Sequence, residues 1–195
     1  RISAGDYNVE IPVRTRDEIG ELTGMFNDMS RSLSVKDDLL KEHRGEIRRL
    51  LRSMMPAAIA DKVHTGEEIV VREHPDVAVI YADIVGLGSL QAALDSGDSL
   101  AMSSELIRQI EATAEDFGIE RVRPVRNGYL GSCGLTVPRL DNVRRTVDFA
   151  LACERIIERV NNESGLNLSL RAGIDTGKVS SGLLGEPSPV FDMWG

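Results

Sequence analysis

The sequence predicts an α+β protein in which one long helix precedes an antiparallel or mixed sheet covered by helices. Apolar residues recur every seven positions between residues 17 and 55, which is typical of a coiled-coil helix. Beyond residue 76, β-branched runs and helical patterns follow the order β-α-β-β-α-β. An Asn127-Gly128 pair between the two central runs predicts a tight hairpin, because both residues tolerate a positive φ.

The composition fits one folded core with an appendage. The chain has 195 residues, of which 42% are hydrophobic. An aromatic content of 4% and a net charge of -8 argue against binding to nucleic acid, but a nucleotide whose phosphates are held by metal ions remains compatible. The two cysteines, Cys133 and Cys153, are expected to be buried thiols in a reducing compartment.

Residues 17–55 are predicted to form one helix about 58 Å long at 1.5 Å per residue. Lys36 and His43 interrupt the heptad pattern, and Val35 and Leu39 form a competing stripe, so a register shift is expected near residues 33–40. A single amphipathic helix lying on its own domain is the alternative. The heptad positions are Ile19, Phe26, Leu33, Leu40, Ile47 and Met54, with Leu22, Met29 and Leu50 three places after members of that series.

The segment before this helix contains a Gly5-Asp6 break, an extended run ending at Pro12, and acidic residues where the helix begins. Together with "MFNDMS", it resembles the C-terminal part of a HAMP domain over residues 1–34. The resemblance implies a parallel, dimeric bundle that joins transmembrane helices to a cytoplasmic output domain. The chain starts with Arg1 and contains no run of 18 apolar residues. We therefore expect a soluble, cytoplasmic piece of a membrane protein.

Pro56 is expected to end the long helix and to start a short one. The remaining elements follow the order of a ferredoxin-like sandwich. "TGKV" at residues 176–179 lacks the pattern of a phosphate-binding loop and is interpreted as a turn between strands. The predicted ranges are a helix at 56–63, a strand at 77–86, a helix at 98–117, strands at 119–125 and 129–135, a helix at 142–161, and strands at 166–174, 179–184 and 190–193.

Asp83 ends the first of these strands, and in this fold that strand lies beside the central hairpin. Asp83 and Asn127 can therefore approach each other. A carboxylate at the end of a buried strand is costly unless it is paired or binds a metal, although a helix cap is an equal alternative. The "GLGS" turn that follows offers backbone N–H groups to a phosphate.

Three motifs in order resemble class III adenylate and guanylate cyclases. "VAVIYADIVGLGSL" is similar to their first strand and metal-binding turn. "RAGIDTGKVSSGLLG" and "SPVFDMWG" resemble later strands, and "LLRSMMPAAIADKVHTGEEIVVREHP" resembles the transducer segment before the catalytic domain. The likeness covers residues 48–195 and implies conversion of ATP or GTP to a cyclic monophosphate and pyrophosphate with two magnesium or manganese ions.

The resemblance assigns metal ligands to Asp83, the Ile84 carbonyl and Asn127. Asn127 stands where the family has a second aspartate, and Arg126 where it has a glycine. An amide oxygen can ligate a hard cation but carries no formal charge, so the metal site is expected to be weakened. Strand alternation is expected to place the Arg126 side chain on the face opposite Asn127.

The family's base-selecting Lys and Asp fall on Arg123 and Asp192, and Asp192 favours ATP over GTP. Arg123 could instead be a solvated strand residue, and Asp192 could simply cap or pair with a neighbour. Backbone groups of Gly86, Leu87 and Gly88 are the expected phosphate contacts. The transition-state Asn and Arg of the family would follow Gly195, so no catalytic residue is assigned here.

Two functions remain open at this point. The first is a HAMP-linked adenylate cyclase divided into 1–34, 35–62 and 63–195, which forms a homodimer through the coiled coil and head-to-tail catalytic domains. The second is a pseudo-cyclase that dimerises and binds nucleotide without efficient turnover. A heterodimer with a complementary cyclase subunit is an intermediate case. The acidic hairpin of diguanylate cyclases is absent, and nothing after His43 matches a histidine kinase.

Overall fold

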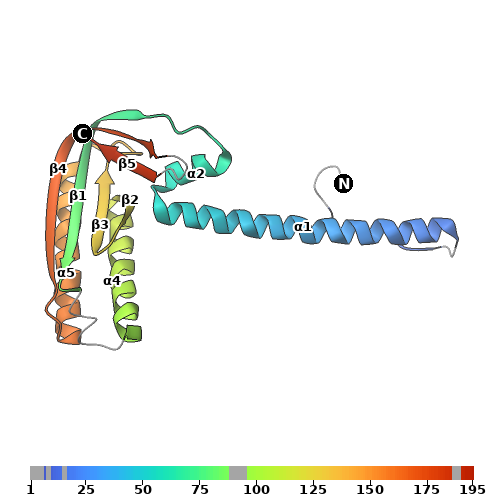
Figure 1. Cartoon of the computed structure of the whole chain (residues 1–195), viewed down its shortest axis with the longest axis horizontal. Helices are drawn as coiled ribbons and strands as arrows, with labels where there is room; N and C mark the ends of the chain where they lie inside the picture. Colours follow the sequence, from blue (N-terminus) through green and yellow to red (C-terminus); the bar gives the residue numbers. More distant parts are fainter. Residues whose placement is uncertain (1–6, 8–9, 15–16, 88–95, 186–189) are drawn as a thin grey trace. The chain divides into compact units, whose positions relative to one another are not determined.

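The computed structural model describes residues 7, 10–14, 17–87, 96–185 and 190–195 (Figure 1). The chain divides into two compact units, Arg1–Arg49 and Leu50–Gly195.

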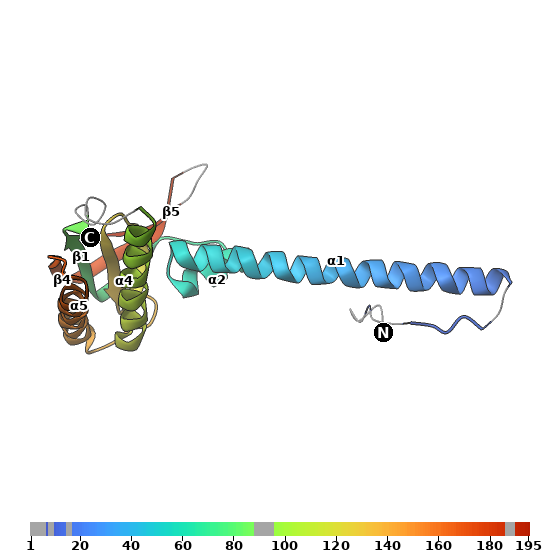
Figure 2. The ribbon, with the colours of Figure 1, turned by 90° about the horizontal axis from the view of Figure 1, so that it is seen from below.

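Helix α1 (Glu18–Met54) is the predicted long helix. Asp17 caps it, because its Oδ1 accepts a hydrogen bond from the backbone N–H of Gly20 at 3.2 Å. Residues 10–14 run beside the first part of the helix (Figure 2), where the Asn27 amide makes two 2.8 Å hydrogen bonds to the backbone of Ile11. The preceding segment is therefore attached to α1 by side chains of the helix itself.

Seven of the nine heptad residues of α1 are exposed in the single chain, whereas Phe26 and Leu33 are partly buried. An apolar surface of this length is typical of a helix that packs against a partner, so it favours the coiled-coil prediction, which remains a prediction. The exposed fractions are 67% for Ile19 and Leu22, 51% for Met29 and Ile47, 55% for Leu40, 59% for Leu50 and 49% for Met54.

Helix α2 (Ala57–Thr65) follows Pro56 directly and ends at Gly66, whose φ of +77° is the left-handed conformation common after a helix. Pro56 separates the two helices as predicted. The guanidinium of Arg52 at the end of α1 binds both carboxylate oxygens of Asp61 on α2, at 2.8 and 3.2 Å. This bidentate pair joins the two helices across the proline.

In the described part of the chain, five antiparallel strands form one sheet in the order β2-β3-β1-β4-β5. The first four have the ferredoxin-like arrangement, and β5 extends the sheet beyond β4. The α+β prediction is therefore confirmed. The elements are β1 (Arg72–Val85), α4 (Ser96–Phe117), β2 (Glu120–Val125), β3 (Gly128–Cys133), α5 (Asn142–Ser164), β4 (Ser169–Leu184) and β5 (Val190–Trp194).

Helices α4 and α5 cover one face of the sheet (Figure 1). Alternate residues of β1 point into this layer, where Ile80 and Phe149 are fully buried. The other face carries a second cluster that includes Val77, Val122 and Phe191. Toward the end of β1 this second face opens, and Tyr81 is 51% exposed. The sheet is thus packed on both faces at one end and exposed on one face at the other.

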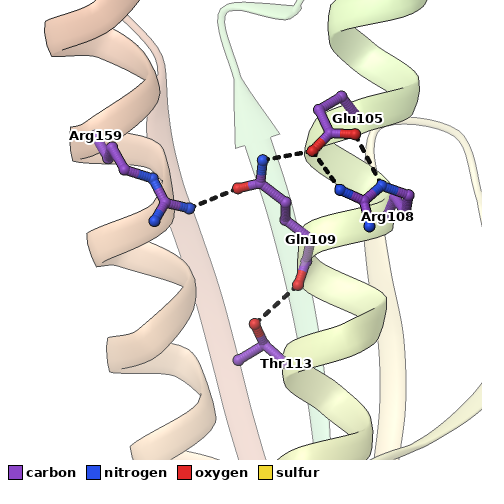
Figure 3. A network of polar contacts seen from close by, with 5 residues as sticks. All are labelled: Glu105, Arg108, Gln109, Thr113 and Arg159. Carbon is purple, nitrogen blue, oxygen red and sulfur yellow. Dashed lines mark hydrogen bonds and ion pairs between the residues drawn. The ribbon is translucent and has the colours of Figure 1, made fainter.

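A polar network joins the two helices on the outside of this layer (Figure 3). Gln109 lies at its centre: its Nε2 donates to Glu105 Oε1 at 2.7 Å, and its Oε1 accepts from Arg159 of α5 at 2.6 Å. Arg108 also binds Glu105 through two N–H groups at 2.6 and 2.8 Å. These hydrogen bonds lower the pKa of Glu105 to about 2, with the bond from Arg108 as the main cause.

Two strand predictions are corrected by the structure. Strand β1 begins at Arg72 rather than at residue 77, because its first residues pair with the second half of β4. Strand β4 is continuous from Ser169 to Leu184, so the interpretation of residues 176–179 as a turn is wrong. An irregularity in the pairing lies instead in β1, between His74 and Val77, where the register shifts.

Candidate functional site

The end of β1 and the start of β3 bring positions 83 and 127 together. Asp83 is paired with Gly128 in the β1–β3 ladder, and the backbone N–H of Ile84 donates to the Asn127 carbonyl at 2.8 Å. These positions are more than forty residues apart in the sequence, and they lie close together because β1 and β3 are adjacent strands. The expected approach of these two positions is therefore present in the backbone.

The hairpin turn differs from the one predicted. Val125 pairs with Gly128, so the two turn residues are Arg126 and Asn127, and Gly128 already belongs to β3. Among the described residues, no non-glycine has a positive φ, and Gly128 does not have one either. The glycine is required for a different reason: a Cβ there would lie 1.9 Å from the carbonyl oxygen of Ala82.

This turn also changes the expectation for Arg126. The alternation argument applies to strand residues, and Arg126 and Asn127 both lie in the turn. Both are exposed. Alternation therefore does not determine on which side of the hairpin either side chain lies.

Asp83 is paired with an arginine that the sequence reasoning missed. Asp83 and Arg171 are direct cross-strand partners in the β1–β4 ladder, and Arg171 Nη2 lies 2.7 Å from Asp83 Oδ2. The Asp83 side chain is 23% exposed, whereas that of Arg171 is 77% exposed. The sequence alone does not show this contact. Asp83 and Arg171 are 88 residues apart, and they meet only because of the register between β1 and β4.

The groups beside the end of β1 are of the kind that bind hard divalent cations. Asp83 supplies a carboxylate and Asn127 an exposed amide, and oxygen ligands of this kind suit magnesium and manganese. Among the described residues, no group of three or more His, Cys, Asp or Glu side chains is placed to hold a metal. Asp83 and Asn127 together provide one formal negative charge, because the amide is neutral. A pair of divalent cations normally requires more negative charge than this.

The two predicted base-selecting residues contact each other. Arg123 Nε on β2 lies 3.3 Å from Asp192 Oδ2 and 3.4 Å from Oδ1 on β5. Asp192 Oδ1 also accepts a hydrogen bond from the backbone N–H of Met193 at 2.9 Å. The side chains are 42% and 32% exposed, so solvent and a ligand can reach both.

The expected phosphate contacts are described only in part. Gly86 has a φ of +98°, and a Cβ there would lie 3.0 Å from the Asn167 carbonyl oxygen, so this turn needs a glycine. The Leu87 side chain packs against the core on the helix-covered face. Gly88 lies outside the described residues.

An antiparallel β-α-β-β-α-β domain with a carboxylate at the end of its central strand, beside a polar hairpin tip, has the architecture of a class III nucleotide cyclase domain. The model of the adenylate and guanylate cyclase catalytic domain matches residues 69–195, and that of the HAMP domain matches residues 1–34. The chain belongs to the adenylate and guanylate cyclase catalytic domain family and carries a HAMP domain at its N-terminal end.

Named relatives and solved structures agree with this family. An adenylate cyclase of Mycobacterium tuberculosis (strain ATCC 25618 / H37Rv) is 27% identical over 147 residues, which cover 75% of this chain and 33% of the relative. The guanylate cyclase domain of RhGC from Catenaria anguillulae, determined in complex with GTP, has 27% identity and a TM-score of 0.57, covering 64% of this chain and 68% of that one.

A bacterial light-regulated adenylyl cyclase supports the fold alone, with 13% identity and a TM-score of 0.64, covering 85% of this chain and 47% of that one. The chain spans about a third of the length of the curated mycobacterial relatives that it matches.

Among the helices in the described part of the chain, none combines the length and the apolar character needed to span a membrane.

Proposed function

We propose that this chain is the HAMP-linked module of an adenylate-type class III cyclase whose turnover is weakened at the cation site. The observation that carries the proposal is the backbone approach of Asp83 and Asn127 where β1 ends and β3 begins. This corner combines a partly buried carboxylate with an exposed amide, next to the turn at Gly86.

Asp83, the Ile84 carbonyl and Asn127 would hold magnesium or manganese. When bound, such an ion lowers the pKa of the ribose 3′-hydroxyl and neutralises phosphate charge. Asp83 contributes the formal charge of this set, and Asn127 contributes an oxygen without charge. A unit-charge pair at 4 Å is worth about 4 kcal/mol at an effective dielectric of 20, so an amide at position 127 costs several kcal/mol of cation binding in principle.

Arg123 and Asp192 would orient the base. The Asp192 carboxylate can accept a hydrogen bond from the exocyclic amino group of adenine, whereas guanine presents a carbonyl oxygen at the same ring position. The guanidinium of Arg123 would donate to a ring nitrogen of the base. The ion pair of these two side chains uses only the Arg123 Nε–H, so the carboxylate keeps further lone pairs and the guanidinium further N–H groups for a base. ATP is therefore the proposed nucleotide.

The alternative is a pseudo-cyclase that dimerises and binds nucleotide without efficient turnover. The pairing of Asp83 with Arg171 favours it, because the carboxylate is already neutralised by a guanidinium. A heterodimer is a third arrangement, in which a complementary subunit supplies the missing groups and activity appears on mixing only.

The proposed division of the chain is a HAMP domain at 1–34, a coiled-coil and transducer segment at 35–62, and a catalytic domain at 63–195. We propose that two copies associate through α1 and through head-to-tail catalytic domains, as the cytoplasmic part of a membrane protein. The exposed apolar residues of α1 support the first of these contacts.

The test is manganese-dependent formation of cyclic AMP by the full-length protein, compared with its Asn127→Asp and Asn127→Ala variants. Weak activity in the parent and a gain of tenfold or more in Asn127→Asp support the weakened cyclase. No activity in the parent, with a large gain in Asn127→Asp, supports the pseudo-cyclase. Equal activity in the parent and Asn127→Asp would remove the argument that the amide limits turnover.

A further inference from the structure

Asp83 has one cross-strand partner on each side in the sheet, and the two partners differ in whether they carry a side chain. On one side Asp83 is paired with Gly128, which has no side chain, and on the other with Arg171. Directly paired residues of antiparallel strands point to the same face, so the Arg171 side chain emerges beside the Asp83 carboxylate. Of the three residues in this row, Arg171 alone can contact that carboxylate through a side chain, and it does so at 2.7 Å.

A guanidinium at this distance opposes the binding of a divalent cation to the same carboxylate. It neutralises the one formal negative charge of the donor set, and it repels a dication placed next to Asp83. The charges of Asp83 and Arg171 cancel each other, and Asn127 adds no negative charge. Both effects weaken cation binding independently of the substitution at position 127.

The pair is nevertheless able to open. The Arg171 side chain is 77% exposed, so it can leave Asp83 without breaking packing contacts in the core. Ion pairs with one exposed partner contribute little to stability, and a cation of higher charge can replace the guanidinium. The Asp83 carboxylate can therefore exchange the guanidinium of Arg171 for a divalent cation.

We propose that Arg171 is an internal competitor for the divalent cation at Asp83, so that it sets the cation affinity of this corner together with Asn127. This inference rests on the proposed function, because it assumes that Asp83 is a cation ligand. In the absence of the cation, the guanidinium occupies Asp83. When the cation binds, Arg171 turns toward solvent.

Strand β4 provides a matched control for this proposal. Lys178 lies on the same strand, is 61% exposed, and pairs with Glu73 of β1 at 2.7 Å. Replacing Lys178 by Gln removes the same charge from the same two-strand ladder, away from Asp83. A general effect of net charge on manganese binding would appear in both variants, whereas competition at Asp83 would appear in Arg171→Gln alone.

The experiment measures binding of Mn²⁺ alone, by titration calorimetry and by the decrease of the free-ion electron paramagnetic resonance signal. Variants Arg171→Gln, Lys178→Gln and Asp83→Asn are compared with the parent. We expect Arg171→Gln to tighten binding about two- to tenfold, in line with the modest strength of an exposed ion pair and the loss of repulsion. Lys178→Gln should bind like the parent, and Asp83→Asn should lose the site.

A second readout follows unfolding in urea, with and without Mn²⁺. The unfolding midpoint of Arg171→Gln should rise more on addition of Mn²⁺ than that of the parent, because tighter binding to the folded state stabilises it more. Should Arg171→Gln fold poorly, Arg171→Met removes the same charge with an unbranched side chain, and its Mn²⁺ affinity should also exceed that of the parent.

The outcomes separate the two proposals. Binding that depends on Asp83 but is equal in the parent and Arg171→Gln overturns competition by Arg171 and leaves the cation site in place. An equal gain in Lys178→Gln and Arg171→Gln assigns the effect to net charge and also overturns the competition. Absence of Asp83-dependent binding in every variant, Arg171→Gln included, overturns the cation site itself and the competition with it.

Discussion

Arg123 and Asp192 form an ion pair although they lie on β2 and β5, at the two ends of the strand order. Arg123 Nε is 3.3 Å from Asp192 Oδ2. The contact is possible because β5 crosses the face of the sheet that α4 and α5 leave uncovered, where Phe191 and Val122 share one apolar cluster (Figure 1). The two residues proposed to contact the base thus lie together in the fold.

The first prediction concerns base selection by Asp192. In Asp192→Asn, the amide can donate as well as accept, so it no longer discriminates against the carbonyl of guanine. We expect the ratio of GTP to ATP dissociation constants to fall about tenfold, the value of one hydrogen bond to a charged group. Displacement of a fluorescent nucleotide measures both constants. An unchanged ratio would show that Asp192 does not read the base.

The second prediction concerns Gly128. A methyl group at this position would overlap the Ala82 carbonyl oxygen, at 1.9 Å, so β1 and β3 would have to separate. We expect Gly128→Ala to lower the free energy of unfolding by about 3 kcal/mol. Gly173→Ala on β4 is the control, since nothing lies within 4 Å of its added Cβ. Urea unfolding compares the two, and similar midpoints would contradict the close approach.

The third prediction concerns pH and Glu105. Its pKa in the folded protein is about 2, below its ordinary value of 4.5, chiefly because Arg108 donates hydrogen bonds to it. A carboxylate whose pKa falls on folding stabilises the folded state above pH 4.5, and this contribution is lost as the pH falls toward 2. Carbon NMR titration should show the low pKa, and Arg108→Gln should raise it. A midpoint near 4.5 in the parent would indicate that the network is open in solution.

The fourth prediction concerns the thiols. Burial raises the pKa of Cys153 to about 12 and also raises that of Cys133, and both side chains are fully buried. Because the thiolate is the reactive form, neither cysteine should react with a disulfide reagent at pH 8 in the folded protein. In urea both should react, which provides the control. Rapid labelling of either thiol under native conditions would contradict this packing.

The fifth prediction concerns association through α1. Ile47 is 51% exposed in the single chain and occupies a heptad position. Ile47→Lys places a charge in the expected interface, so the dissociation constant of the dimer should rise more than tenfold. Glu46→Lys adds a positive charge outside the heptad positions and should have little effect. Sedimentation equilibrium measures both, and equal dissociation constants would argue against a coiled coil.

The site was predictable where it depended on the order of elements. A hairpin following a strand-helix unit places its second strand beside the first, so the approach of positions 83 and 127 followed from topology. The turn itself was predicted one residue too far along, because Asn-Gly is a common turn pair. In the structure Gly128 is needed for its close contact with Ala82 rather than for a positive φ.

The sequence by itself determined the long helix, the break at Pro56 and the order of strands, because heptad spacing, proline and β-branched runs act on neighbouring residues. Only the tertiary structure decided that β4 is continuous, that Arg171 binds Asp83 and that Arg123 binds Asp192. These three features depend on strand register and on how β5 crosses the sheet. Register is set by packing and pairing over the whole domain, and no local pattern specifies which residues meet across two strands.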